Sequence, residues 1–334
     1  MLERLFFIVV LIILLIFYNR MEDKNKEDER YDNYNAIKDY LLDDNSLAKS
    51  RKPILWIHIP YDYNSRKWVS FGSRTSYDLN QPYLYLTIKS IIAKCDDSFT
   101  ICIVDDNSFH RLIPEWKVDM NIVSNPILKN MRVLGMLKLL EIYGGMTCPV
   151  SFLCMRDLVD MYTKGTHGDK MFVCETTNRN ITSTTSDYFP SLQFCGVKKN
   201  NVTTKQLISH VQQTMSEDFT SELEFQGNFE RWVNYKINKN QINVINGSEI
   251  GIKTRDETPI IIDDLMSNNF LNLSKTTFGI FIPADEMLKR NKFMWFARSS
   301  EKQVLDSNTI LGNYILDCVG RNNVTNITYV MPEH

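Results

Sequence analysis

The fold of this 334-residue chain is decided by the stretch Tyr143-Gly144-Gly145-Met146-Thr147-Cys148-Pro149-Val150-Ser151-Phe152. It follows a helical pattern over residues 130–143. Two glycines after such a pattern stop a helix, because glycine adopts the left-handed conformation without steric cost. Residues 150–154 then form a short apolar segment, and Arg156-Asp157-Leu158 could open the next element. Helix, tight stop, short strand and new helix together predict an α/β fold.

The predicted helix before the glycines carries a narrow polar stripe. Arg132, Gly135 and Lys138 recur at every third position. Apolar side chains cover the other side of the helix, namely Val133, Met136, Leu137, Leu140 and Tyr143. We expect a helix with so little polar surface to be mostly buried.

An amphipathic helix that ends in Tyr-Gly-Gly, followed by a short segment and Asp157-Leu158, resembles the transferases of glycosyltransferase family 32 and the related capsular polysaccharide synthesis proteins. The resemblance implies the glycosyltransferase A fold, in which a nucleotide-binding α/β sheet has helices on both faces. It also implies a nucleotide-sugar donor and a glycan or glycoprotein acceptor as partners.

The sequence departs from this family at the metal site. In the family, the glycine pair leads into an Asp-X-Asp motif that holds a divalent metal on the donor diphosphate. The same spacing puts these two aspartates at Pro149 and Ser151, and the family's helix Asp and Arg at Val133 and Met136. None of these four side chains carries a charge, so the motif is degenerate.

We therefore expect no divalent metal and no other cofactor. Cationic side chains such as Arg66, Arg74 or Lys198 would then neutralise the leaving diphosphate. Arg66 and Arg74 lie in a long polar loop over residues 61–78, and loops at strand ends often carry sites. A solvated loop without a ligand is the alternative.

Residues 5–18 form an uninterrupted apolar and aromatic run between Arg4 and Arg20. The run is short for a membrane span, but flanking basic side chains can snorkel to the interfaces. A cleaved signal peptide is the alternative, although no small-X-small cleavage site follows the run. We expect a transmembrane signal anchor over residues 1–20, with residues 5–18 in lipid. The protein would be single-pass and type II, with its domain in the lumen of the secretory pathway.

Residues 21–52 are charged and polar, which predicts a solvated stem. Residues 53–334 suit one glycosyltransferase-like α/β domain. The net charge of −2, without a basic cluster, argues against nucleic acid as a partner. Seven scattered cysteines give no zinc or redox motif, but a luminal domain would allow one or two disulfides. Glycosylation sequons, which also arise by chance, begin at Asn180, Asn201, Asn246, Asn272, Asn323 and Asn326.

The first strand is predicted over residues 53–59, an apolar run with proline at its start and after its end. In the resembling family this strand carries an Ile-His pair beside the nucleotide pocket, and Ile57-His58 matches it. His58 is therefore a candidate nucleotide-binding residue. The alternative is a structural hydrogen bond at the end of the strand.

A helix over residues 81–94 and a strand over residues 98–104 follow, and the strand ends at Asp105-Asp106-Asn107. Ligands of a parallel sheet bind beyond the carboxyl ends of its strands. Asp105 and Asp106 are therefore candidates for nucleotide binding, through a ribose or a metal. The alternative is an ordinary turn and helix N-cap, which Asp-Asp-Asn-Ser also suits.

The second half of the chain supplies candidate general bases. Glu175 ends a predicted strand over residues 170–175, and Asp187 ends the Thr/Ser/Asn-rich loop that follows. Asp263 follows a predicted strand over residues 259–262. Each carboxylate could remove a proton from an acceptor hydroxyl, so Asp187, Glu175 and Asp263 are the candidate catalytic residues.

Other elements of the second half are predicted from apolar periodicity. They are strands over residues 191–197 and 278–282 and helices over residues 204–215, 285–290 and 304–318. Residues 292–298 combine three aromatic side chains with two basic ones. This segment is either a stacking platform for a base or sugar ring or a core strand.

The sequence therefore favours a membrane-anchored glycosyltransferase that works without metal, or its degenerate descendant. The alternative is a non-catalytic glycan- or protein-binding module that retains the fold. A structural membrane-tethered protein without a small-molecule ligand is a third class.

Overall fold

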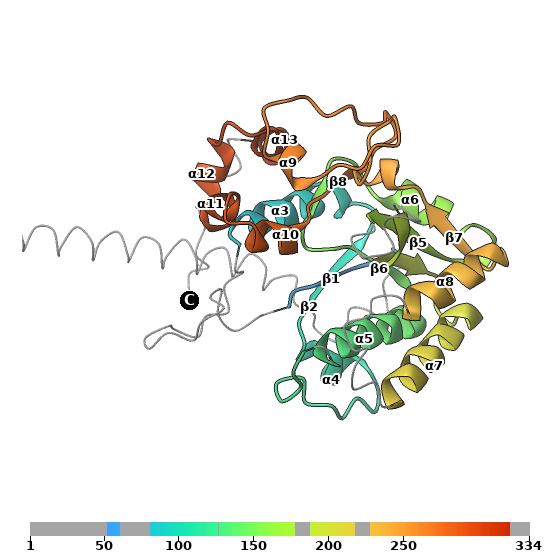
Figure 1. The fold of residues 1–334 in the computed structure, drawn as a ribbon. Coiled ribbons are helices and arrows are strands. Elements are labelled where there is room, and N and C mark those ends of the chain that lie inside the picture. Colours follow the sequence, from blue (N-terminus) through green and yellow to red (C-terminus); the bar gives the residue numbers. More distant parts are fainter. Residues whose placement is uncertain (1–51, 61–80, 126, 178–187, 218–227, 321–334) are drawn as a thin grey trace, which may run out of the picture. The chain divides into compact units, whose positions relative to one another are not determined.

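The computed structural model describes residues 52–60, 81–125, 127–177, 188–217 and 228–320, all of which belong to the compact unit Leu42–His334 (Figure 1). The predicted anchor, almost all of the predicted stem and the site candidates Arg66, Arg74 and Asp187 lie outside these residues. Within the described ranges, no helix has both the length and the apolar character needed to cross a membrane.

The centre of the fold is a mixed six-stranded sheet with the order β2-β1-β3-β6-β5-β7. β6 is antiparallel to both of its neighbours, and the remaining pairs are parallel, so every strand except β6 points in one direction. With its helices, this sheet is an α/β fold compatible with a Rossmann-like arrangement. The strands are β1 (Ile54–His58), β2 (Thr100–Val104), β3 (Gly145–Thr147), β5 (Met171–Thr177), β6 (Tyr188–Val197) and β7 (Ile242–Ile245).

Helices cover both faces of the sheet. Figure 1 shows α5 (Ile127–Tyr143), α7 (Val202–Ser216) and α8 (Asn228–Asn238) together on one side, and α5 and α8 both contact β6. On the other side, α3 (Tyr83–Cys95) contacts α12 (Glu301–Leu305) and α13 (Ile310–Val319). The first four residues of β1 are buried, as expected for a strand inside a covered parallel sheet.

The two glycines stop α5 as the sequence predicts. Gly144 and Gly145 have φ angles of 75° and 97°, and the Gly144 amide donates a hydrogen bond to the Leu140 carbonyl (2.9 Å). The strand after the stop differs from the prediction, because β3 begins at Gly145 itself. The apolar segment over residues 150–154 instead contributes β4 (Phe152–Cys154), which pairs with β8 (Gly279–Phe281) in a separate two-stranded sheet. Pro149 lies between β3 and β4, where it has no amide hydrogen to donate to a ladder.

Several other predicted elements are confirmed within a few residues. They are β1, α3, β2, α5, β5, β6, α7, β8 and α10 (Ala284–Lys289). No element was predicted for α4 (Ser108–Leu112), α8 or β7. α4 is too short to show a helical period.

Two predictions in the C-terminal third are wrong, and one of two alternatives for a third segment is excluded. The predicted strand over residues 259–262 gives way to α9 (Ile262–Leu265), because the Asp264 carboxylate accepts a hydrogen bond from the Ile261 amide (3.0 Å) and caps this turn. For residues 292–298 the core-strand alternative is wrong, because this segment contains the helix α11 (Met294–Arg298). The closing helix is split into α12 and α13, since the Thr309 hydroxyl accepts a hydrogen bond from the Gly312 amide (3.0 Å) and starts a new helix.

Gly145 should tolerate no side chain. A Cβ atom at this position would overlap the Ile54 carbonyl oxygen, which belongs to the β1 backbone and cannot move aside. We expect Gly145→Ala to lower the free energy of unfolding by about 4 kcal/mol or more, measured by urea denaturation.

Gly168→Ala is the matched control. Gly168 also has a positive φ of 71°, but its added Cβ would meet only Lys170 Cε, at 3.8 Å. Its cost should therefore be about 1 to 2 kcal/mol, the usual penalty of the left-handed conformation. Equal losses for the two variants would contradict the close approach of β3 to β1.

Candidate functional site

The carboxyl ends of five strands lie at one edge of the sheet. β1, β2, β3, β5 and β7 point the same way and end at His58, Val104, Thr147, Thr177 and Ile245. In open α/β sheets, ligands bind outside this edge. We call it the carboxyl edge, and the candidate site is built on it.

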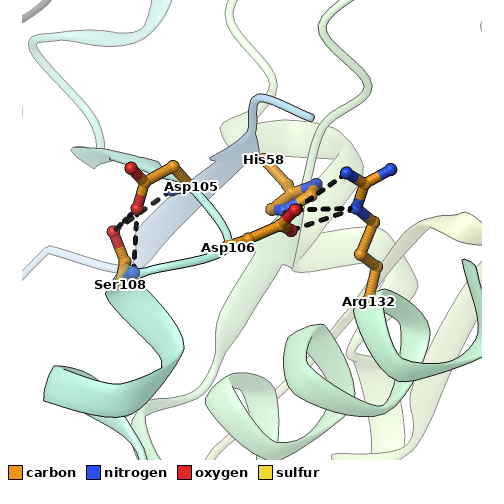
Figure 2. Close-up of polar contacts among 5 residues, drawn as sticks. All are labelled: His58, Asp105, Asp106, Ser108 and Arg132. Carbon is orange, nitrogen blue, oxygen red and sulfur yellow. Dashed lines mark hydrogen bonds and ion pairs between the residues drawn. The ribbon is translucent and has the colours of Figure 1, made fainter. Parts of the chain in front are cut away.

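The carboxyl edge holds a cluster of three side chains, His58, Asp106 and Arg132 (Figure 2). His58 Nε2 lies 2.9 Å from Asp106 Oδ1. The Arg132 guanidinium donates to both carboxylate oxygens, from Nε to Oδ1 (3.0 Å) and from Nη2 to Oδ2 (2.8 Å). Such a bidentate pair is both directional and strong. We call these three residues the His58 cluster.

The His58 cluster is only slightly accessible to solvent. The side chains of His58, Asp106 and Arg132 are 13%, 18% and 16% exposed. Burial by itself raises the pKa of Asp106, but the hydrogen bonds and charges of His58 and Arg132 outweigh it and lower this pKa to about 2. Asp106 is therefore ionised at neutral pH and can accept a hydrogen bond from His58 Nε2. In the tautomer that carries its hydrogen on Nε2, the unprotonated ring nitrogen is Nδ1.

Three elements position this cluster. His58 is the last residue of β1, and its ring stacks on Phe109 of α4 with centroids 5.4 Å apart. Arg132 belongs to the polar stripe of α5. The two other members of that stripe also face α4 and the segment after it, since a Cβ on Gly135 would lie 2.8 Å from the Phe109 ring and Lys138 Nζ lies 5.8 Å from the Trp116 ring.

Arg132 is the site residue that the sequence analysis missed. The sequence did contain a feature that could indicate a role for Arg132, namely its place on the polar stripe of an otherwise apolar helix. A stripe that faces solvent gives the same pattern, and only the position of α4 against α5 distinguishes the two.

The two adjacent aspartates have different roles. Asp105 turns away from His58, and its Oδ1 accepts hydrogen bonds from the Ser108 amide (2.8 Å) and hydroxyl (2.6 Å) at the start of α4 (Figure 2). The contacts of Asp105 therefore agree with the alternative of an ordinary turn before a helix, in which Asn107 is the N-cap residue. Asp106 alone joins the His58 cluster.

A second charged group on the carboxyl edge contains Glu175. Its Oε2 accepts hydrogen bonds from Lys253 Nζ (2.9 Å) and from the Gly247 amide (2.7 Å). Lys253 also pairs with Glu257 and lies 4.5 Å from the centroid of the Tyr188 ring. Its side chain is only 4% exposed. Burial lowers the pKa of Lys253, but the bonds to Glu257 and Glu175 outweigh it, so this pKa lies above its ordinary value.

The two charged groups stand apart on the same edge. β1 and β5 are separated by three strand positions, or roughly 14 Å at the usual spacing of strands. The segment after β3 lies between them, and its backbone is held by hydrogen bonds from the Thr87 hydroxyl to the Val150 carbonyl (2.6 Å) and from the Ile282 amide to the Ser151 carbonyl (3.0 Å).

The degenerate motif positions offer no carboxylate. Val133 and Met136 are partly buried against the hydrophobic core below α5. Pro149 is partly exposed and Ser151 is buried. Among the described residues, no group of three or more His, Cys, Asp or Glu side chains is arranged to hold a metal ion.

Two other predicted residues lie apart from the carboxyl edge clusters. Asp263 is on α9, where its carboxylate pairs with Arg290 (2.6 Å) and Lys292 (3.5 Å). Lys198 follows β6, which runs in the opposite direction, so it lies at the other edge of the sheet and pairs with Asp169. The expectation that Lys198 faces the diphosphate is therefore wrong for a ligand on the carboxyl edge.

No family model matches this sequence, and no curated protein sequence is significantly similar to it. A function for the carboxyl edge must therefore follow from the chemistry of its side chains. His58 offers Nδ1, which has no hydrogen-bond partner in the described part of the chain. Beside it lies the positive charge of Arg132, already oriented by Asp106. His58 Nδ1 can accept a hydrogen bond from a ligand, while the Arg132–Asp106 ion pair orients the site and carries no net charge.

Asp106→Asn should destabilise the protein in a pH-dependent way. The folded-state pKa of about 2 lies below the ordinary value of 3.8. The ionised carboxylate therefore contributes stability that is complete above about pH 5 and is lost as the pH falls towards 2. We expect a loss of about 2 kcal/mol at pH 7, and this difference from the wild type should shrink in denaturation curves measured between pH 5 and pH 2.

Asp105→Asn is the control for this prediction. The asparagine side-chain oxygen can still accept the hydrogen bond from the Ser108 amide, so its loss should stay below about 1 kcal/mol. A difference between Asp106→Asn and the wild type that does not change with pH would contradict the ion pair.

Proposed function

We propose that this protein binds a nucleotide-sugar donor on the carboxyl edge and transfers the sugar to a glycan or protein acceptor without a metal ion. The observation that carries the proposal is the His58 cluster, which forms a preorganised polar site at the carboxyl ends of β1 and β2. The sequence resemblance to glycosyltransferase family 32 supports the same assignment.

The His58 cluster would bind the nucleoside. His58 Nδ1 can accept a hydrogen bond from a ribose hydroxyl or from an N–H group of a base. The carboxylate of Asp106 already interacts with Arg132 and His58, so its charge is compensated and repels an anionic ligand less. Phe109 supports the ring of His58 from below and keeps it in this orientation.

The group around Glu175 would face the sugar or the acceptor. A nucleotide sugar has a nucleoside at one end and a sugar at the other, joined by a diphosphate. Its two ends could contact the two separate polar groups on the carboxyl edge. Glu175 is the candidate base on this edge, oriented by Lys253 and by the Gly247 amide. A base must lie within hydrogen-bond reach of the acceptor hydroxyl to remove its proton.

The leaving diphosphate would be neutralised by side chains. The family's aspartates correspond to Pro149 and Ser151, which cannot bind a metal as carboxylates do. Arg132 is paired with Asp106, so Arg66 and Arg74 of the loop over residues 61–78 are the candidate cations. Fixed cations can stabilise the charge that develops on a leaving diphosphate.

The second candidate function is binding without turnover, and a specific observation favours it. Asp106, Glu175 and Asp263 each form an ion pair, with Arg132, Lys253 and Arg290 respectively. A carboxylate held by a cation is a poorer proton acceptor, whereas a binding site does not need one. In either case, we propose that residues 1–20 anchor the chain in a membrane and that the domain lies in the secretory lumen.

Nucleotide binding should not depend on a divalent metal. We expect isothermal titration of the full-length protein with uridine or guanosine diphosphate to give the same affinity with manganese and with EDTA. His58→Ala should weaken binding about tenfold, the loss of roughly one hydrogen bond. Lys198→Ala removes a cation from the opposite edge and should leave the affinity unchanged. An affinity that EDTA abolishes would refute the metal-free site.

Turnover distinguishes the two candidate functions. The full-length protein is incubated with a panel of sugar nucleotides, and released nucleoside diphosphate is measured. If the protein is a transferase, Glu175→Gln should lower kcat by about 100-fold or more and leave nucleotide affinity unchanged, and Asp263→Asn should have little effect. Thermal stabilisation by a nucleotide without any release would instead establish a binding module.

A further inference from the structure

Two cysteine side chains lie in contact outside the candidate site. Cys95 is the last residue of α3 and Cys154 is the last residue of β4, and both are fully buried. Their sulfur atoms are 3.8 Å apart, although the residues are separated by 59 positions in the sequence. All seven cysteines of the chain are described, and none of them forms a disulfide.

The surroundings hold this pair in place. The Cys154 amide donates a hydrogen bond to the Ser90 hydroxyl of α3 (2.9 Å), so the backbone of β4 is tied to the helix that carries Cys95. The Cys154 thiol also contacts the Arg156 carbonyl (3.0 Å). A disulfide bond is about 2.05 Å long, so the two sulfurs need to approach by roughly 1.8 Å. Rotation of the two side chains about χ1 can supply much of this movement.

We propose that Cys95 and Cys154 are a disulfide-forming site that links α3 to β4. The inference does not depend on the proposed function. The contact between the two sulfur atoms selects one pair among the seven cysteines, whereas the sequence spacing allows many possible disulfide pairings.

The oxidant would be a small disulfide such as oxidised glutathione. The thiolate of one cysteine attacks a sulfur of the small disulfide, which releases one small thiol and leaves a mixed disulfide. The second cysteine then attacks its neighbour's sulfur and releases the second small thiol. Two protein thiols are thereby oxidised to one disulfide, and one small disulfide is reduced to two thiols.

Access to the pair requires local opening. The hydrogen bond from Cys95 and burial raise the pKa of the Cys154 thiol well above its usual range, so little thiolate forms while the pair stays closed. Both cysteines are the last residues of their elements, where fraying begins. We therefore expect slow oxidation, followed by stabilisation, because the cross-link closes a long loop in the unfolded chain.

Peptide mapping tests the pairing. Full-length protein is purified in reductant and incubated with oxidised glutathione. Remaining thiols are blocked with iodoacetamide, and the protein is digested with trypsin. The expected product joins residues 95–111 to residues 139–156. Each of these peptides contains two cysteines, so fragmentation of the linked pair must place the bond on Cys95 and Cys154. The oxidised protein should melt roughly 5 to 10 °C higher than the reduced protein.

Serine variants provide the controls. Cys102→Ser and Cys148→Ser change the other cysteine in each peptide and should keep both the linked product and the increase in Tm. Cys95→Ser and Cys154→Ser should lose both. Cys148 is the critical competitor, because it is buried like Cys95 and Cys154 and shares a tryptic peptide with Cys154. A bond from Cys148, or folded protein in which Cys95 and Cys154 stay alkylatable after oxidation, would overturn the proposal. Peptide mapping of the wild-type protein identifies the linked cysteines even if a serine variant fails to fold.

Discussion

The close approach of Gly145 to Ile54 is the constraint on which the rest of the structure depends. A side chain at this position would overlap the β1 backbone, so only glycine lets β3 begin directly beside β1. The Trp56 indole N–H reinforces the junction by donating a hydrogen bond to the Gly144 carbonyl (2.9 Å). The direction of β3, set here, determines that the segment after it reaches the same edge as His58 and Asp106.

The His58 cluster illustrates how a buried charge becomes acceptable. A partly buried carboxylate is unfavourable by itself, because the protein interior solvates it less well than water does. Two hydrogen-bonded partners from two other elements, β1 and α5, compensate this cost for Asp106. The consequence is an oriented, mostly buried polar cluster rather than an exposed surface acid.

Charges on the carboxyl edge are mostly satisfied within the protein. Glu175 and Lys253 neutralise each other, as Asp106 and Arg132 do. This arrangement suits recognition of a ligand by hydrogen bonds rather than by net charge. The proposed transfer would require a ligand to free one of these carboxylates, whereas the proposed binding without turnover would not.

Local sequence signals determined much of the fold. Apolar runs ending at polar residues marked β1 and β2, and the glycine pair marked the end of α5, because these signals act within a few residues. His58 and the acidic pair were also recognisable, since they stand at strand ends. Short elements such as α4 and α9 were not, because a single turn carries no measurable period.

Tertiary structure alone decided how these parts combine. It assigned Asp106 to the His58 cluster and Asp105 to the turn that leads into α4, although the two residues are adjacent and identical. It also places Arg132 in the candidate site, Lys198 at the opposite edge of the sheet and Cys95 in contact with Cys154. The sequence by itself determined which residues could form strands, stops and polar sites. Which of them meet depends on the direction and order of strands far apart in the chain, and no local pattern encodes those contacts.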